Sequence, residues 1–444
     1  CRRLAEVVKS TVRTINSQFG VGIGGSSYLA PVYMKAKNNP NEKIKIYIMD
    51  EMAMCNMGLL YEICRNLAEH DIIYFLGDIK QLPPIGKGNP FALLMKLLPC
   101  VELGVSKRAA EGSDINYNTT LVNCLSDGVV KELSYNDKDF MKVECADAVI
   151  PMEVTKAWSK FMNGTMNGTK YEEDDIQVIT GYQKEEIIFS APRLNKPLQQ
   201  LLRKNDMKLF VNGDREFYTN DRVIHLRLNN YSMNRYVEVE KGVYQSVVTF
   251  GIVNGEVGKL VGVARSDMMN IIDFSDDQCT PGEGIYENVD ADTMRDLIKK
   301  RMDRGDTFRE DSRTRKNNIY FIRVDVYDVE LGRDVCVLYQ AKGRMVGVGE
   351  IALEGSDVGC IDLAYALSTH KMQGSQSRVV ICPFGTECRP TFINRNMMNT
   401  MFTRARDCVC CVGSVTGSES PINRGRQFKS KEDCNDTLSV LVNS

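Results

Sequence analysis

Two short apolar runs in the first quarter of the chain each lead into acidic residues. Residues 44–49 run into Asp50 and Glu51, and residues 71–76 run into Asp78 after one glycine. Apolar runs of this length are typical of parallel strands that are buried on both faces of their sheet. In open α/β sheets, ligands bind at the carboxyl ends of the strands. We therefore expect an α/β fold in which these acids lie at the ligand-binding edge.

Apolar spacing elsewhere predicts the helices and strands that would accompany this sheet. Helical spacing covers residues 57–69, 91–98, 115–125 and 394–405. The first of these helices has the length of a crossover between two parallel strands. Further buried strands are expected from the apolar runs at 177–182, 379–382 and 409–412. Many short strand segments separated by turns follow residue 206 and indicate a β-rich region.

Composition is that of an ordinary globular protein. The 444 residues are 43% hydrophobic and 26% charged, enough for roughly two to three domains. No apolar run approaches the ~20 residues that span a bilayer, and no signal peptide is recognisable, so we expect no membrane partner. The net charge is -2, so any nucleic-acid binding requires a local basic groove.

The cysteines indicate a reducing environment. There are 15, and they are scattered along the chain. The one Cys-x-x-Cys spacing runs from Cys408 to Cys411, inside an apolar run and without a second pair. We interpret it as buried strand, which disfavours a zinc site and places the protein in the cytoplasm.

The acids that follow the first two runs suit nucleotide hydrolysis. Asp50 is placed like the acid that holds Mg²⁺ in P-loop NTPases, and Glu51 beside it would polarise the attacking water. Gly77, Asp78 and Gln81 resemble a phosphate sensor on the neighbouring strand. The alternative is that Asp50 and Glu51 only cap the next helix. The segment Gly-Asp-x-x-Gln-Leu-Pro-Pro at the right distance favours the catalytic interpretation.

These segments resemble known helicase motifs. Residues 50–54 and 77–84 are similar to motifs II and III of superfamily 1 helicases. The closest branch is the RecD/Dda-like one, whose members move 5′ to 3′ on single-stranded DNA. Residues 360–375 resemble motif V, with Met372 where Ser is usual, and residues 401–406 resemble motif VI. The motifs occur in the order of the family.

The resemblance covers most of residues 1–415 and implies a domain organisation. It implies two RecA-like parallel-sheet motor domains, the first incomplete, with an SH3-like β insert. The expected domains are a partial domain 1A at 1–128 with a 1B pin insert at 19–41, domain 2A at 129–205 and 356–416, the 2B insert at 206–355, and a C-terminal tail at 417–444.

The family's phosphate-binding loop lies upstream of the first matching segment. No Gly-x-x-x-x-Gly-Lys-Ser/Thr sequence occurs in this chain, and the chain does not begin with Met. We expect a fragment or processed piece that lacks the N-terminal P-loop portion and is inactive by itself.

The resemblance also implies a role for each site residue. Glu51, Gln81, Arg108 and Arg404 would be catalytic, Asp50 would bind the metal and the cofactor, Gly77, Asp78, Gln373 and Gly374 would bind the cofactor, and Thr14, Thr369, His370 and Lys371 would bind DNA. Arg404 would be an arginine finger. Two alternatives are that Arg108 is a solvated residue beside Lys107 and that Thr14 only ends a strand. We expect residues 369–374 to be helical, so that one turn separates the DNA-facing from the ATP-facing side chains.

The function that the resemblance implies is an ATP-dependent DNA helicase. ATP and Mg²⁺ would be the cofactors, and single-stranded DNA and duplex junctions the partners of a monomer. Replication or repair proteins are further partners that the resemblance allows. Hydrolysis between the motor domains would move them along one DNA strand. Two alternatives are an RNA-directed superfamily 1 helicase, since both kinds track phosphates, and a non-catalytic nucleic-acid-binding scaffold if the missing P-loop is natural.

Overall fold

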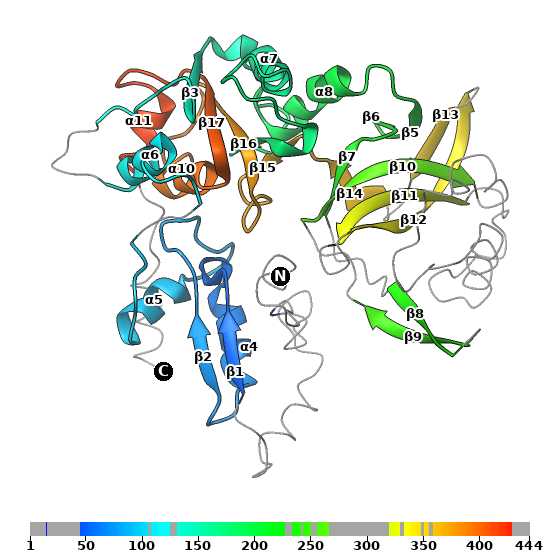
Figure 1. The fold of residues 1–444 in the computed structure, drawn as a ribbon, viewed down its shortest axis with the longest axis horizontal. Coiled ribbons are helices and arrows are strands. Elements are labelled where there is room, and N and C mark those ends of the chain that lie inside the picture. Colours follow the sequence, from blue (N-terminus) through cyan, green and yellow to red (C-terminus); the bar gives the residue numbers. More distant parts are fainter. Residues whose placement is uncertain are drawn as a thin grey trace. The chain divides into compact units, whose positions relative to one another are not determined.

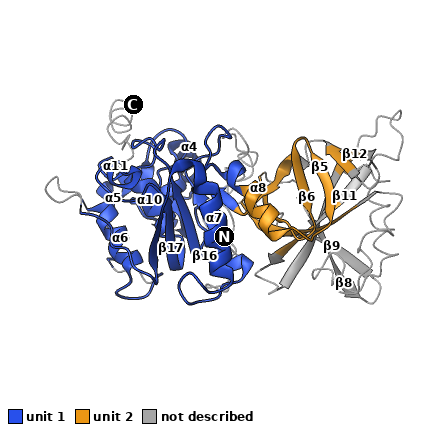
Figure 2. Cartoon of the chain, turned by 90° about the horizontal axis from the view of Figure 1, so that it is seen from above, with its two compact units in different colours: residues 1, 10–194, 366–444 blue, residues 2–9, 195–365 orange. Residues whose placement is uncertain are grey.

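The fold was analysed in a computed structural model. It describes residues 15, 45–104, 108–124, 131–226, 233–240, 243–249, 255–265, 319–328, 333–347, 350–354 and 358–428. Thr14, the expected 1B insert and the tail beyond residue 428 lie outside the described residues. The chain divides into two compact units, shown in different colours in Figure 2. The first unit contains residues 10–194 and 366–444, and the second contains residues 195–365.

A two-stranded parallel sheet carries the first two apolar runs (Figure 1). Strand β1 (Ile46–Met49) pairs in register with β2 (Ile72–Phe75), and helix α4 (Met57–Arg65) forms the crossover between them. This confirms the expected strand–helix–strand unit. The helix ends before the predicted residue 69 because the Asp71 carboxylate accepts a hydrogen bond from the Ala68 N–H, which holds the chain in a turn before β2.

Described residues cover only one face of this two-stranded sheet. Side chains from β1, β2, α4 and α5 (Pro90–Leu97) pack around a cluster made of Met49, Met52, Cys55, Ile63 and Phe91. On the other face, Ile46 is 63% exposed and Ile48 61%, and Tyr74 on the neighbouring strand is 57% exposed. The expectation that both faces are buried is therefore wrong for the described part of the chain. Successive strand residues point to opposite faces, and only the α4 face has packing partners among the described residues.

A five-stranded parallel sheet forms the second part of the first unit. Its strands, in spatial order, are β15 (Ala366–Ser368), β4 (Ile176–Thr180), β16 (Ser377–Phe384), β17 (Ala405–Gly413) and β3 (Phe140–Glu144). Val178, Ile381 and Cys410 face one another across the three central strands and are fully buried. Because this sheet is covered on both sides, its apolar runs are continuous, and the three strands expected from those runs are confirmed.

Helices α7 (Ile150–Met162) and α10 (Arg395–Phe402) flank the five-stranded sheet in the first unit (Figure 1). Apart from α4, the other described helices are α5, beside the two-stranded sheet, α6 (Asp114–Asn123), α8 (Ala191–Leu202, which runs into the second unit) and α11 (Pro421–Gly425). Short 3-10 turns in the two units lie at Met52–Met54, Asp147–Val149, Glu173–Asp175 and Val358–Cys360. Helix α7 packs on β16 and β17, and α10 packs on the same strands and on α6. Helix α10 begins where the Asn394 side chain accepts the Met397 N–H. None of the described helices combines the length and apolarity needed to cross a membrane.

The second unit is built around a mainly antiparallel sheet. Its eight strands, in spatial order, are β14 (Ile361–Leu363), β7 (Arg222–His225), β10 (Val257–Arg265), β11 (Ile319–Asp328), β12 (Arg333–Gly347), β13 (Glu350–Glu354), β5 (Lys208–Asn212) and β6 (Arg215–Tyr218). A separate hairpin pairs β8 (Met233–Glu240) with β9 (Val243–Thr249). The β-rich region expected after residue 206 is confirmed, while its SH3-like character stays a prediction.

Inside the second unit, a buried carboxylate organises several segments. Asp221 accepts hydrogen bonds from the Tyr365 hydroxyl at 2.7 Å, the Gln199 amide at 2.6 Å and the Tyr218 N–H at 2.7 Å. Arg203 also donates to the Tyr365 hydroxyl, at 2.9 Å. Burial raises the pKa of Asp221 to about 6. This network fixes Tyr365, the residue that precedes β15.

Candidate active site

The carboxyl ends of β1 and β2 meet at one edge, as the sequence predicts. The Leu76 N–H donates to the Met49 carbonyl at 2.8 Å, and the Met52 N–H donates to the Leu76 carbonyl at 2.9 Å. These backbone bonds hold the loop at residues 50–51 beside the loop at residues 77–78. Both sets of predicted acids therefore share one edge.

Glu51 is a half-buried carboxylate on an unusual backbone. Its φ of 56° lies in the left-handed region, which non-glycine residues seldom adopt. It occupies the position before a 3-10 turn, but its side chain makes no capping hydrogen bond, and Asn56 caps α4 instead. The interpretation of Glu51 as a mere cap is therefore wrong. Asp50 is exposed, and its carboxylate accepts the Glu51 N–H at 2.9 Å.

The charged residues that affect Glu51 come from several connecting segments of the first unit. Burial raises the pKa of Glu51, the Arg404 and Arg108 cations lower it, and the Asp50 and Asp78 carboxylates raise it. The net effect is a pKa above the ordinary value of 4.5. A glutamate with a raised pKa is a stronger base than a solvated one, which suits a group that polarises water.

The loop after β2 is fixed by close packing and a local turn. A Cβ on Gly77 would lie 2.8 Å from the Phe91 ring, so the position excludes larger residues. The Asp78 carboxylate accepts the Lys80 N–H at 2.8 Å, and the Asp78 carbonyl accepts the Gln81 N–H at 3.2 Å. Gln81 is 8% exposed, and its side-chain oxygen is buried without a hydrogen-bond partner among the described residues. A buried polar atom in that state indicates a ligand or water partner.

Two arginines converge on Thr403. Arg404 is fully buried and donates to the Thr400 carbonyl at 3.2 Å, the Ser375 carbonyl at 3.2 Å and the Thr403 hydroxyl at 3.3 Å. Arg108 donates from Nη1 to the Thr403 carbonyl. The alternative of a solvated Arg108 is therefore wrong. These backbone acceptors were missed in the sequence, because a carbonyl that orients an arginine leaves no signal in residue type.

Residues 369–374, at the end of motif V, form turns and not the expected helix. The Met372 N–H donates to the Thr369 carbonyl at 3.2 Å, and the Gln373 N–H donates to the His370 carbonyl at 3.3 Å. Gly374 has a φ of 76°, which a helix cannot contain. The Gln373 side chain donates to the Leu82 carbonyl in a long hydrogen bond of 3.4 Å, so it faces the loop of Gln81.

Of the residues expected to contact DNA, Thr369 differs from the expectation. It is fully buried, and its N–H and hydroxyl both donate to the Thr180 carbonyl, at 2.9 and 3.1 Å. Its hydroxyl is thus used inside the fold, where it fixes the start of the segment. His370 and Lys371, which follow, are both partly exposed. Burial lowers the pKa of His370, so its imidazole is neutral at pH 7 and offers a hydrogen bond and not a charge.

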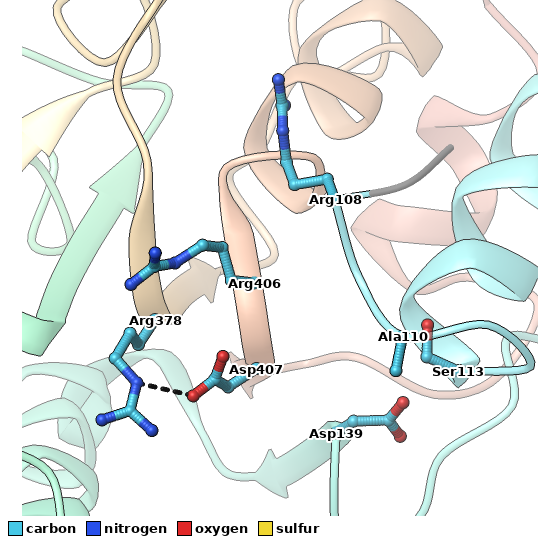
Figure 3. A pocket seen from close by; sticks show the side chains of 7 residues that line it. All are labelled: Arg108, Ala110, Ser113, Asp139, Arg378, Arg406 and Asp407. Atoms are coloured by element: carbon cyan, nitrogen blue, oxygen red, sulfur yellow. Dashed lines mark hydrogen bonds and ion pairs between the residues drawn. The ribbon is translucent and has the colours of Figure 1, made fainter. Parts of the chain in front are cut away.

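A cavity of about 550 Å³ lies beside this site (Figure 3). It is lined by Arg108, Ala110, Ser113, Asp139, Arg378, Arg406 and Asp407. Arg108 is the one site residue among them, and its side chain extends away from the other labelled residues in Figure 3. Arg378 forms an ion pair with Asp407 at 2.7 Å. The cavity is therefore separate from the acids of β1 and β2.

The donor groups at the two loops fit a magnesium nucleotide. Among the described residues, no group of three or more His, Cys, Asp or Glu side chains could hold a metal ion. Mg²⁺ bound with a nucleotide needs only one or two protein carboxylates, since phosphates and water complete its shell. The exposed Asp50 carboxylate meets that need, and the unpartnered oxygen of Gln81 lies on the neighbouring loop.

Both halves of the motif set match helicase or NTPase families. Residues 363–411 match the UvrD-like helicase C-terminal domain, and residues 2–144 match an AAA domain. One match is to a helicase domain and the other to an AAA domain, and both agree with the resemblance of the motifs to superfamily 1 helicases. The expected α/β fold with parallel sheets is confirmed.

Alignments with solved Pif1 helicases cover most of this chain. A Bacteroides Pif1 in complex with ADP-AlF3 and single-stranded DNA is 13% identical, with a TM-score of 0.44 over 97% of this chain and 84% of that one. The Candida albicans Pif1 is 15% identical, with a TM-score of 0.39 over 96% and 85%. Likenesses of this degree carry no functional argument.

Proposed function

We propose that this protein is a helicase that uses ATP and Mg²⁺ to move 5′ to 3′ along single-stranded DNA and to unwind duplex DNA. The observation that carries the proposal is the convergence at Glu51. The Glu51 carboxylate follows a strand of the two-stranded sheet, and the positive charges of Arg404 and Arg108 act on it, although both arginines come later in the chain. A general base and two cations around one space are what phosphoryl transfer to water requires.

Each residue of the cleft has a role in this proposal. Glu51 orients and polarises the attacking water, and the amide of Gln81 holds that water in line. Asp50 holds Mg²⁺, which when bound neutralises charge on the phosphates. Arg108 supplies positive charge from the first motor domain, and Arg404 supplies it from the second. The loops around the nucleotide are shaped by the residues that the sequence predicts to bind the cofactor, namely Gly77, Asp78, Gln373 and Gly374.

DNA contacts are proposed for the exposed part of motif V and for Thr14. His370 donates a hydrogen bond to a phosphate, and Lys371 adds a positive charge. Thr369 positions both by its two bonds to Thr180. The partners we propose are single-stranded DNA and duplex junctions, with replication or repair proteins, for a cytoplasmic monomer with the domain boundaries given above.

Residues 1–444 by themselves are proposed to bind nucleotide weakly and to be inactive. They contain no Gly-x-x-x-x-Gly-Lys-Ser/Thr sequence, so they lack the cradle of backbone N–H groups and the lysine that hold phosphates in P-loop enzymes. Titration calorimetry of this chain with ATP tests the point, and micromolar affinity would contradict it.

The test of the proposed function is Glu51→Gln in the natural polypeptide that contains these residues. Turnover should fall by about 10²–10⁴-fold, because the general base is lost. ATP binding should be retained, because Asp50 is unchanged. Glu69→Gln, at an exposed position of the same domain, is the matched control. Near-normal hydrolysis by Glu51→Gln would contradict the proposal, and stimulation by RNA but not by DNA would redirect it to an RNA helicase.

A further inference from the structure

One face of helix α10 is bonded to the loop that carries Gln81. The side-chain amide of Asn396 lies 3.3 Å from the Ile79 carbonyl, 3.3 Å from the Lys80 carbonyl and 2.9 Å from the Gln81 carbonyl. Asn396 is 5% exposed, so these contacts are made away from solvent. One amide group thereby meets three successive carbonyls of the loop after β2.

Thr400 continues this contact one helical turn later. Its hydroxyl accepts the Leu82 N–H at 2.9 Å and donates to the Asn396 carbonyl at 2.7 Å, and the residue is fully buried. Residues four apart lie on the same face of a helix, so both side chains address the same loop. The loop is therefore held through consecutive backbone groups from Ile79 to Leu82.

The same helix leads to the arginine of motif VI. The Arg404 guanidinium donates to the Thr400 carbonyl at 3.2 Å. Thr400 is thus bonded through its side chain to the loop of Gln81 and through its carbonyl to Arg404.

We propose that Asn396 and Thr400 are positioning residues that lock the Gln81 loop to the helix that delivers Arg404. The inference rests on the proposed function, in which both groups face the nucleotide. These bonds join the expected domain 1A, which carries the water-orienting amide, to domain 2A, which carries the arginine, and they hold the two groups in one arrangement as long as they persist. Separation of the two elements would leave the Asn396 amide and the Leu82 N–H without these acceptors, which disfavours intermediate placements.

Substitutions of Thr400 test this role by turnover. Thr400→Val keeps the shape and removes the hydroxyl, and should lower kcat about 10-fold while KM for ATP and affinity for single-stranded DNA stay within about 2-fold. Thr400→Ser restores the hydroxyl and should restore kcat. Thr155→Val is the matched control, because Thr155 makes the same bond to the residue four before it, on α7. A normal kcat in Thr400→Val, or no rescue by Ser, would overturn the proposal.

A second measurement needs no ATP hydrolysis. Hydrogen exchange at the Leu82 amide of the 444-residue chain should accelerate at least ~5-fold in Thr400→Val and Asn396→Leu, because its acceptor is lost or displaced. The Leu76 amide, which donates to Met49 within the two-stranded sheet, is the internal reference. Unchanged exchange at Leu82 would overturn the lock even if the wild type hydrolyses ATP. Faster Leu82 exchange in the variants, together with a natural polypeptide that does not hydrolyse ATP, would instead contradict the proposed function alone.

Discussion

The two parallel sheets of the first unit are built from similar apolar runs but differ in what surrounds them. Ile381, in the five-stranded sheet, is fully buried, whereas Ile48, in the two-stranded sheet, is 61% exposed. The acids Asp50, Glu51 and Asp78 follow the strands of the two-stranded sheet, and the motif VI arginine lies directly before β17 of the five-stranded sheet. The residues proposed to act in hydrolysis therefore lie next to two different sheets. One sheet is buried, and the other has an outer face without a packing partner among the described residues.

The side chains proposed to act in hydrolysis also differ in burial. Asp50 is exposed and Glu51 is half-buried, so both can meet a ligand without rearrangement. Arg404 is fully buried and has three oxygen acceptors within the fold. The carboxylates are thus presented by backbone position, whereas the arginine is held by its own hydrogen bonds. Variants on the two sides should fail in different ways.

The largest expected effect is that of Arg404→Ala. ATP hydrolysis should fall by about 10³-fold or more, with and without DNA, because the cation that stabilises the transferring phosphoryl is lost. Affinity for single-stranded DNA should change little. The measurement is ATPase rate against DNA concentration in the natural polypeptide, with Arg406→Ala at the neighbouring exposed arginine as control. A variant that lost DNA binding but kept its DNA-free rate would break the assignment.

The same isoleucine-to-alanine change in each sheet tests the difference in burial. Ile381→Ala should lower the free energy of unfolding by roughly 2–5 kcal/mol, because it leaves a cavity in a closed core. Ile48→Ala should change it by no more than about 0.5 kcal/mol, since that side chain is mostly exposed. Chemical denaturation of the 444-residue chain measures both. Equal losses would mean that the outer face of the two-stranded sheet is covered in solution.

His370→Ala should produce a smaller and more selective effect. Stimulation of ATP hydrolysis by single-stranded DNA should weaken by about 10-fold, because a phosphate contact is lost, while the DNA-free rate stays near wild type. Since burial lowers the pKa of His370, the contact should persist unchanged from pH 7 to 8. His70→Ala, at an exposed histidine, serves as control. Wild-type stimulation in His370→Ala would remove this residue from the DNA site.

The smallest effect concerns the pH dependence of hydrolysis. Glu51 must be ionised to act as a base, and its pKa is raised above 4.5, so the rate should fall as pH decreases through a value higher than 4.5. The Asp78 carboxylate contributes to that rise. Asp78→Asn keeps an oxygen for the Lys80 N–H and removes the charge, so the acid limb should move to lower pH by a fraction of a unit. A limb that moved upward would contradict this electrostatic picture.

Sequence alone predicted the parts of the site that depend on strand ends. The apolar runs placed Asp50 and Asp78 at one edge of the sheet. The resemblance of the motifs led us to expect Arg108 and Arg404 at one site, and both arginines donate hydrogen bonds to Thr403. What it missed depends on contacts between distant residues. The exposure of Ile48 reflects which neighbours cover a face, and apolar periodicity does not report that.

The segment 369–374 shows a second kind of limit. Its residues are compatible with a helix, but Thr369 is fixed to the Thr180 carbonyl and Gly374 adopts a positive φ. These constraints come from a strand nearly two hundred positions earlier in the chain and from a backbone choice open to glycine. Tertiary contacts therefore overrode the local propensity. The bonds from Asn396 to three loop carbonyls were invisible for the same reason.

At position 51 the left-handed backbone is more stable with glycine, whereas the proposed activity requires the glutamate carboxylate. A residue with a Cβ in that region costs roughly 1–2 kcal/mol, and glycine relieves most of the cost. Glu51→Gly would thus favour the folded chain while it removes the carboxylate that we propose as the base. Stability alone favours glycine at this position, so a glutamate there agrees with the proposed role in turnover.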